Sequence, residues 1–244
     1  MRLILMAHGR VGQEITRFLV DNYREDLALI VTEGVNEIST LAEHNGIPNT
    51  LYLSDKQLMT QLEVGYDLGV LAWWPHLLRP ETLDMTRLGF VNTHPSLLPH
   101  HRGKHSSFWA LMEQAPFGVS MHQVDAGIDT GSVLAQSSVE YSWCDTGETL
   151  HIRAQDAMVA LFEASYPLLR AGMLVGVEQE VGGGSFHLAS EIESAKRLDL
   201  EQSYLGRDLI NLLRAGTFGN QAGCWFEDAG RRYEVSISIK EISK

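Results

Sequence analysis

Residues 91–103 read VNTHPSLLPHHRG and extend an apolar run that has the pattern of a buried strand. Side chains two apart in a strand share a face, so Asn92 and His94 point together and Thr93 points away. Pro95 has no backbone N–H and cannot continue a strand ladder. The pattern therefore predicts that His94 lies at the carboxyl end of a strand, where open α/β sheets bind their ligands.

Short apolar runs alternate with amphipathic segments through the first part of the chain. The apolar runs predict strands, and apolar side chains at helical spacing predict helices between them. The expected strands are 3–7, 27–32, 68–73 and 87–92, and the expected helices are 13–22, 37–45 and 55–63. This alternation predicts an α/β fold, a Rossmann-like and mostly parallel sheet with helices on both faces.

The pattern changes after Pro95. Further elements are expected as helices at 107–114, 146–171 and 207–214, and as strands at 119–124, 133–139, 224–227 and 233–239. Pro167 is expected to kink or end the long helix. The consecutive glycines at 182–184 are the best linker candidate. We therefore expect a catalytic domain at 1–180 and a small C-terminal α+β appendage at 181–244.

Composition limits the classes of partner. The 244 residues carry a formal net charge of −12 and no basic run, which argues against a nucleic-acid partner and favours a small molecule. Two cysteines without metal spacing are typical of a reduced intracellular protein. The apolar run at the N-terminus is too short for a membrane span and lacks a cleavage site, so we expect a cytoplasmic protein with no membrane partner.

Asn92 and His94 have the side chains that acyl transfer requires. An amide can donate to a developing oxyanion, and a histidine can donate to the same oxygen or move protons near neutral pH. A nearby carboxylate would orient the histidine and favour its charged form. The acidic, glycine-rich loop at 125–131 offers Asp129 for this role, with Asp125 as the alternative.

Together the two motifs resemble the folate-dependent formyltransferase family, over roughly residues 1–175. The residues that carry the resemblance are Asn92, His94 to Pro99, Arg102, Gly103, His122 and Asp125 to Gly131. The resemblance implies transfer of a formyl group from the co-substrate N10-formyltetrahydrofolate to an amine. It also implies a catalytic trio of Asn92, His94 and Asp129, in which the first two stabilise the oxyanion and the third orients the histidine.

The same resemblance places the folate pterin against residues 71–78 and the loop 125–129, largely on backbone groups. The residues expected to contact the folate are Leu71, Trp73, His76, Leu77, Leu78, Asp125, Gly127 and Ile128. Consecutive strand residues face opposite ways, so one of Trp73 and Trp74 is expected in the pocket wall and the other in the core.

Weaker signals bear on the acceptor amine. Residues 102–110 and the tail 198–239 resemble nucleotide-sugar N-formyltransferases, which implies an amino sugar linked to a nucleotide and used in polysaccharide biosynthesis. Phe108 and Trp109 could equally be core residues of a helix. The residues of this segment expected to bind the acceptor are Arg102, Lys104, His105 and Trp109.

The turn after the first strand offers a second acceptor-binding element. Backbone N–H groups at the start of the following helix could bind a phosphate, with His8 and Arg10 beside them. The same sequence is also consistent with a simple tight turn.

Other activities stay open at this point. The acceptor could be an amino acid, a peptide or methionyl-tRNA, although a short acidic chain argues against tRNA. Water as acceptor would make the protein a formyltetrahydrofolate hydrolase, and an idle site would leave a folate-binding module. Gly9 and Gly12 do not form the glycine motif of an NAD dehydrogenase. The four histidines between residues 94 and 105 lack the spacing of a metal site, so no metal is expected.

The resemblance also implies a homodimer formed through the C-terminal part. Trp225 and Phe226 are expected to be exposed and would suit such an interface, although they suit a small core of the appendage equally well.

Overall fold

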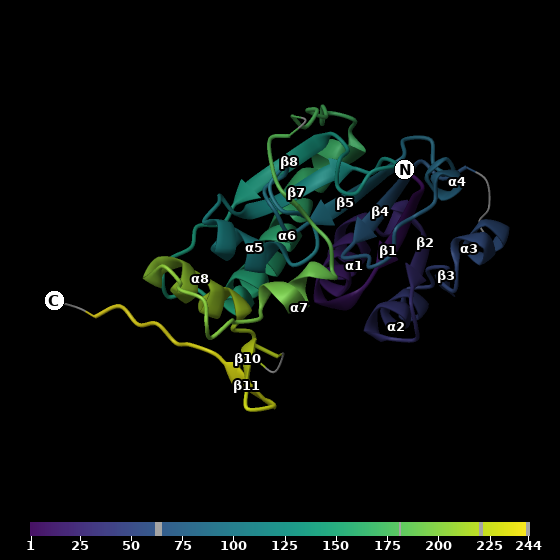
Figure 1. The fold of residues 1–244 in the computed structure, drawn as a ribbon. Coiled ribbons are helices and arrows are strands. Elements are labelled where there is room, and N and C mark those ends of the chain that lie inside the picture. The colour runs from purple at the N-terminus through teal and green to yellow at the C-terminus, as the bar shows by residue number, and fades with distance from the viewer. Residues whose placement is uncertain (62–64, 181, 220–221, 243–244) are drawn as a thin grey trace. The chain divides into compact units, whose positions relative to one another are not determined.

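The computed structural model describes residues 1–61, 65–180, 182–219 and 222–242. The chain forms two compact units, each made of three segments. Figure 1 labels the helices and strands of both. Unit 1 comprises Met1–His94, Ser120–Gln136 and Gln155–Gln179, and unit 2 comprises Pro95–Val119, Ser137–Ala154 and Glu180–Lys244. The two-domain division after residue 180 stays a prediction, and the compact units divide the chain along other lines.

A seven-stranded sheet has the order β3-β2-β1-β4-β5-β7-β8. Its strands are β1 (Leu3–Ala7), β2 (Leu27–Thr32), β3 (Asn49–Leu51), β4 (Leu68–Ala72), β5 (Phe90–His94), β7 (Gly118–Gln123) and β8 (Val133–Ser138). The neighbours from β3 to β5 pair in parallel, and β5 pairs with β7 in the antiparallel direction. The predicted α/β class with a mostly parallel sheet is confirmed.

Helices cover the sheet of unit 1. They are α1 (Gly9–Tyr23), the 3-10 helix η1 (Arg24–Asp26), α2 (Glu37–His44), α3 (Asp55–Gln61), α4 (Pro80–Leu83) and the later part of α6 (Gly147–Arg170). The ring of Phe18 on α1 meets the rings of Phe162 and Tyr166 on α6 edge-on, at centroid distances of 6.2 and 6.4 Å. Aromatic packing of this kind adds to the hydrophobic burial that fixes the helices on the sheet.

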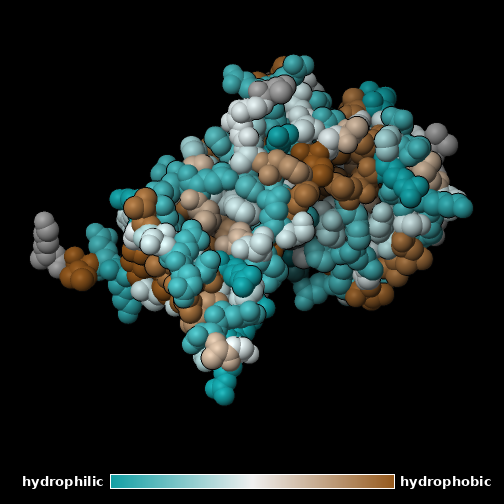
Figure 2. Space-filling model, in the orientation of Figure 1, coloured by the Kyte–Doolittle hydropathy of each residue, from teal (hydrophilic) through white to brown (hydrophobic). Residues whose placement is uncertain are grey.

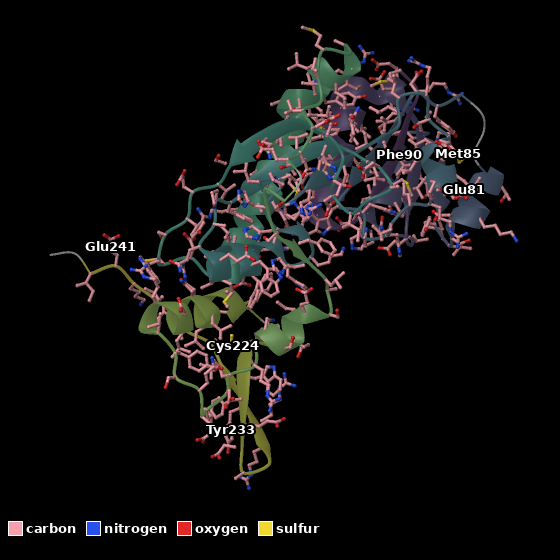
Figure 3. All side chains as sticks on the ribbon, turned by 45° about the horizontal axis from the view of Figure 1, so that its top comes forward. Glu81, Met85, Phe90, Cys224, Tyr233 and Glu241 are labelled. Carbon is pink, nitrogen blue, oxygen red and sulfur yellow. The ribbon has the colours of Figure 1, made fainter. Side chains whose placement is uncertain are left out.

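The central strands lie in the core of unit 1. Every residue of β1 and β4 is buried, as expected for parallel strands covered on both faces. Phe90, at the start of β5, lies beside Gly69 of β4, where a Cβ atom would overlap its ring (Figure 3). The amino-terminal ends of β4 and β5 are therefore closely packed in the core.

Unit 2 contains the shorter elements. They are β6 (Arg102–Gly103), α5 (Ser106–Glu113), β9 (Phe186–His187), α7 (Glu191–Ala195), α8 (Gly206–Gly216), β10 (Cys224–Asp228) and β11 (Arg231–Val235). Helices α5 and α8 contact each other, β6 pairs with β9 in parallel, and β10 and β11 form an antiparallel hairpin. Cys224 and Tyr233 lie on the two strands of this hairpin (Figure 3). Burial of the Cys224 thiol raises its pKa to about 11.

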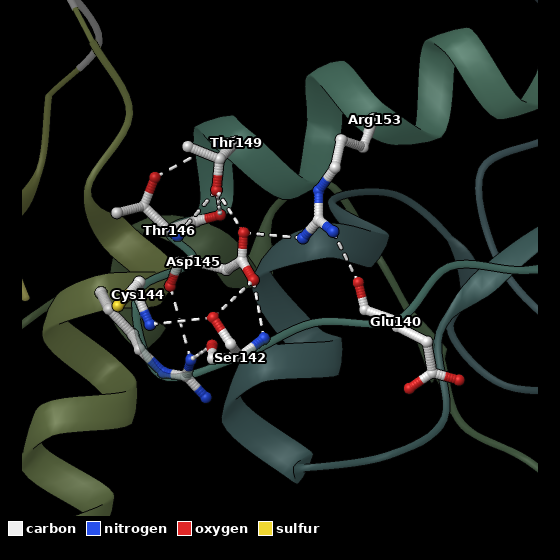
Figure 4. A network of polar contacts seen from close by, with 8 residues as sticks. Glu140, Ser142, Cys144, Asp145, Thr146, Thr149 and Arg153 are labelled. Carbon is white, nitrogen blue, oxygen red and sulfur yellow. Dashed lines mark hydrogen bonds and ion pairs between the residues drawn. The ribbon is translucent and has the colours of Figure 1, made fainter. Parts of the chain in front are cut away.

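A polar network fixes the start of α6 in unit 2 (Figure 4). Asp145 accepts hydrogen bonds from the Ser142 backbone N–H at 2.6 Å and the Thr149 hydroxyl at 3.1 Å, and Arg153 pairs with it at 2.6 Å. Burial opposes ionisation of Asp145, but these donors and the positive charge outweigh it and lower its pKa. The carboxylate therefore joins the loop before α6 to side chains of the first two turns of that helix.

Several element boundaries differ from the sequence predictions. The first helix begins at Gly9 rather than residue 13, because Gly9 (φ +59°) turns the chain directly into it. The fourth expected strand runs from Phe90 to His94 rather than over 87–92, since Gly89 (φ +75°) belongs to the preceding turn. The long helix continues past Pro167 to Arg170. The third expected helix ends at Gln61, and the remainder of that prediction lies outside the described residues.

Among the described residues, no helix is both long enough and apolar enough to cross a membrane.

Candidate functional site

Asn92, His94 and Asp129 lie close together in unit 1. The first two stand two apart on β5, and Asp129 follows β7, which pairs with β5. His94 Nδ1 is 3.4 Å from a carboxylate oxygen of Asp129. The structure thus brings together the three predicted catalytic residues, and Asp129, rather than Asp125, is the carboxylate beside the histidine.

His122 is a fourth member that the sequence analysis did not assign to the site. It lies directly opposite Asn92 on β7. Its Nε2 is 3.3 Å from Asn92 Nδ2 and 3.5 Å from Asp129 Oδ1. His122 therefore connects the amide and the carboxylate of the trio.

Hydrogen bonding fixes the proton on one nitrogen of His122. Its Nδ1 is 2.7 Å from the backbone oxygen of Gln123, which can only accept, so Nδ1 carries a proton. Neutral His122 then has its lone pair on Nε2 and accepts from the Asn92 amide. The tautomer of His122 thus sets the orientation of the Asn92 amide.

The polar groups of the site lie largely out of water. The side chains of His94, His122 and Asp129 are 6%, 2% and 12% exposed, and Asn92 is half-buried. Hydrogen bonds and charges act more strongly in such surroundings than in water. The arrangement can therefore stabilise a developing negative charge and hold a proton next to it.

The loop that carries Asp129 is held by its own side chains. Asp125 accepts from the Gly127 N–H at 3.0 Å and the Thr130 hydroxyl at 2.6 Å, so it closes the loop instead of reaching His94. Asp129 itself has a left-handed backbone (φ +53°), which is uncommon for residues other than glycine. Strained backbone of this kind persists where surrounding contacts hold it.

Gln179 supplies such contacts from the end of unit 1. Its side-chain amide donates to the backbone oxygens of Asp129 and Gly131, both at 2.8 Å. Gly131 is required there, because a Cβ atom would overlap the backbone oxygen of Gln123. No sequence signal pointed to Gln179, since it lies 50 residues from Asp129 in the chain.

All eight residues predicted to contact folate lie in unit 1, on β4, on the segment that follows it and on the Asp129 loop. Leu71 is buried in the core, so only its backbone could meet a ligand. Trp74 is the core residue of the pair, whereas Trp73 is half-buried with φ +59°, and its place in a pocket wall stays a prediction. Leu77 is 72% exposed, and apolar residues gather on the surface of unit 1 near β4 and β5 (Figure 2).

The two side chains predicted beside a phosphate, His8 and Arg10, both contact carboxylates. His8 lies 2.5 Å from the Glu33 carboxylate, which also contacts the predicted folate residue His76 at 2.7 Å. Arg10 pairs with Asp156 on α6. The first turn of α1 therefore has acidic as well as basic groups around it.

The predicted acceptor-binding residues of the segment 102–110 lie in unit 2. Arg102 is on β6, Trp109 is on α5, and Lys104 and His105 lie between these elements. Desolvation of the His105 ring and the positive charges of Lys196 and Lys104 lower its pKa, so the ring is neutral at pH 7. Trp109 is half-buried and stacks on His187 with ring centroids 3.8 Å apart. Phe108 is buried, as expected if it is a core residue of the helix.

Trp225 and Phe226 are half-buried, rather than exposed as expected. The Arg232 guanidinium lies 3.8 Å above the Trp225 ring, and Phe226 stacks on Tyr233. Cross-strand contacts within the hairpin therefore cover part of both rings.

Two family profiles match the chain. One, described as formyl transferase, matches residues 30–164, which is more than half of the chain. The other, described as the N-formyltransferase dimerization C-terminal domain, matches residues 191–241.

Curated relatives match part of the chain. A methionyl-tRNA formyltransferase of Paraburkholderia xenovorans is 36% identical over 123 residues, which cover 50% of this chain and 38% of the relative. A dTDP-4-amino-4,6-dideoxyglucose formyltransferase of Mycobacterium bovis is 26% identical over 151 residues, which cover 62% of this chain and 64% of the relative. The match therefore spans less than two thirds of either relative.

Solved structures share the fold. A sugar N-formyltransferase from Shewanella superposes with a TM-score of 0.83 at 20% identity, covering 100% of this chain and 99% of that one. An N-formyltransferase from Helicobacter canadensis, in complex with folinic acid and dTDP-3-aminofucose, has a TM-score of 0.70 at 17% identity and covers 88% of this chain and 80% of that one.

Proposed function

The chain belongs to the formyl transferase family, and on this basis we propose that it moves a formyl group from N10-formyltetrahydrofolate to the amine of a nucleotide-linked amino sugar. The observation that carries the proposal is the contact between His94 and Asp129 beside Asn92, at the carboxyl end of β5. This is the edge of an open α/β sheet where ligands bind.

The reaction requires a neutral amine to attack the formyl carbon while the formyl oxygen gains negative charge. Asn92 would donate its amide N–H to that oxygen, and protonated His94 would donate to it as well. Asp129 keeps His94 charged and oriented, because an adjacent carboxylate favours the imidazolium. As the bond to folate N10 breaks, the proton released by the amine would pass through this pair to N10.

The residues around the trio suit a folate as formyl donor. The exposed Leu77 and the half-buried Trp73 offer apolar surface for a flat ring, and the Asp129 loop offers backbone polar groups. The formyltransferase from Helicobacter canadensis binds folinic acid, which supports the same class of donor here.

Two relatives support an amino sugar as acceptor. The mycobacterial relative is named for dTDP-4-amino-4,6-dideoxyglucose, and the Helicobacter enzyme binds dTDP-3-aminofucose. The net charge of −12 argues against the tRNA substrate for which the Paraburkholderia relative is named. Arg102 and Lys104 in unit 2 remain our candidates for the diphosphate, with Trp109 for the sugar or base.

The match of residues 191–241 to a dimerization domain supports a homodimer through this segment. A cytoplasmic location stays a prediction.

The first experiment is a mass-spectrometric assay of the purified chain with N10-formyltetrahydrofolate and a panel of nucleotide-linked amino sugars. We expect one member to gain a single formyl mass. Asn92→Ala should lower its turnover by about 10²–10³, which is the usual effect of removing one oxyanion donor. A matched reaction without sugar measures hydrolysis.

Other outcomes would contradict parts of the proposal. Formylation of an amino acid, peptide or methionyl-tRNA, with no sugar formylated, would replace the acceptor class. Release of formate without any acceptor would identify a hydrolase. Unchanged turnover in folded Asn92→Ala would overturn the assignment of the site.

A further inference from the structure

A second polar cluster lies in unit 2, whereas the Asn92 trio lies in unit 1. Its members are His101, Glu113 and His187. One ligand-type atom from each lies within 4.8 Å of the other two, and both histidines are among the preferred metal ligands in proteins. We propose that these three side chains form a Zn²⁺ site.

The distances within the cluster fit one ion. Zn²⁺ binds nitrogen and oxygen ligands at about 2.0–2.2 Å, so atoms on neighbouring corners of a tetrahedron are roughly 3.3–3.5 Å apart. His101 Nδ1 and Glu113 Oε2 are 3.4 Å apart. His187 Nε2 and Glu113 Oε1 are 2.7 Å apart, and a small rotation of the carboxylate would open this distance.

Charge around His187 also favours a cation. Glu113 faces its Nε2 at 2.7 Å, and Glu191 faces its Nδ1 at 3.1 Å. The two carboxylates thus flank opposite nitrogens of one ring. A metal ion bound to Nε2 and to Glu113 would leave Nδ1–H to donate to Glu191.

Glu191 would then accept a hydrogen bond from the ring nitrogen of His187 that does not bind the metal. Such an acceptor fixes the tautomer and the ring orientation and increases the basicity of the ligand. Ser185 orients the other carboxylate in a similar way, since its hydroxyl donates to Glu113 Oε2 at 2.9 Å.

The backbone holds the three ligands before any ion binds. His101 directly precedes β6, and His187 ends β9, which pairs with β6. Glu113 is the last residue of α5, one helical turn after Trp109, whose ring stacks on His187. The β6–β9 pairing therefore links the turn of His101 to His187, and the Trp109 ring links His187 to α5.

The exposure of the ligands predicts an open coordination position. His101 is fully buried and the side chain of His187 is 13% exposed, whereas that of Glu113 is 34% exposed. Three protein ligands with solvent on one side leave room for a water or another small ligand on the metal.

The test is titration of the full-length, untagged chain with Zn²⁺ after removal of metals by a chelator, followed by equilibrium dialysis. We expect one Zn²⁺ per chain. His187→Phe keeps a ring against Trp109 but removes a ligand, and Glu113→Gln removes a charge. Each should weaken binding about tenfold or more, and Glu191→Ala should weaken it by about 10–100-fold. His44→Gln, an exposed histidine on α2, is the matched control and should leave binding unchanged.

Thermal melts without metal establish that each variant is folded. If His187→Phe does not fold, the partly exposed Glu113→Gln still decides the question. Less than one Zn²⁺ per chain, or unchanged affinity in the folded ligand variants, would overturn the proposal and leave the cluster as a hydrogen-bonded ion-pair network.

Discussion

His122 shows how one side chain can set the chemistry of another at the proposed site. Its Nδ1–H donates to the Gln123 backbone oxygen, so only its Nε2 contacts Asn92 and Asp129. As a hydrogen-bond acceptor it holds one amide proton of Asn92 and leaves the other for an oxyanion. We therefore regard His122 as a positioning residue.

Replacement of His122 by Phe should lower kcat and leave KM for the acceptor nearly unchanged. The lost hydrogen bond contributes about 1 kcal/mol, which corresponds to about a fivefold decrease in rate. His122→Gln keeps an acceptor near Asn92 and should restore part of the rate. Steady-state kinetics of both variants measure this, and equal rates for the two would contradict the positioning role.

Sequence patterns predict the long elements of the fold and miss the short ones. Strands β1 and β2 have the predicted bounds, because runs of five or six apolar residues are distinctive. Strands β6 and β9 have two residues each and carry no periodicity. They form because backbone groups distant in the chain pair with each other. A pattern within a few consecutive residues does not predict such pairing.

The candidate site divides in the same way. Asn92 and His94 interrupt an apolar strand with polar residues and so attract notice in the sequence. The parts played by His122 and Gln179 depend on cross-strand register and on a contact 50 residues along the chain. The sequence marks His122 only through the family resemblance and gives no sign of Gln179, so their contacts become clear only when the elements are placed in space.

The close approach of β4 and β5 leads to a prediction for Gly69. A Cβ atom at this position would overlap the Phe90 ring, so Gly69→Ala should force the buried ring to move. Overpacking of this kind costs about 1–3 kcal/mol of unfolding free energy. Urea denaturation measures it.

Gly34→Ala is the matched control, because a Cβ atom there meets no atom within 4 Å. It should change the unfolding free energy far less than Gly69→Ala. Equal effects of the two substitutions would show that the space around Phe90 can adapt.

At the scale of the whole molecule, neither compact unit is one continuous stretch of the chain. Each unit contains three separate segments, so the chain passes between the units several times. Stability therefore depends on contacts between residues far apart in the chain.

Asp26 is an example within unit 1, because it joins the start of the chain to the end of α6. Its buried carboxylate binds the N-terminal ammonium group, the Tyr166 hydroxyl and the Arg170 guanidinium.

These contacts predict a dependence of stability on pH. Burial disfavours the charged form of Asp26, but Arg170, Tyr166 and the N-terminal ammonium outweigh it and lower the pKa below its ordinary value of 3.8. A carboxylate with a lowered pKa stabilises the fold fully above its unfolded pKa and loses this contribution as the pH falls through the folded one. Asp26→Asn should therefore destabilise the protein at pH 7 by about 1.5–3 kcal/mol. The difference from the parent chain should shrink below about pH 4.

Urea unfolding at a series of pH values from 7 to about 3 measures this difference. Asp21→Asn, at an exposed position on α1, is the matched control for the change in net charge. A pH-independent difference between Asp26→Asn and the parent would contradict an ionised Asp26 in the folded state.

The hydrogen bonds from Gln179 to the Asp129 loop have a consequence for the order of events during translation. A ribosome completes β5 and the loop long before it adds Gln179, so a nascent chain has Asn92 and His94 before it can hold Asp129 in place. The left-handed backbone of Asp129 lacks its support until residues 155–179 join the unit. A stalled or truncated product that ends before this segment would thus carry the trio's side chains without their arrangement.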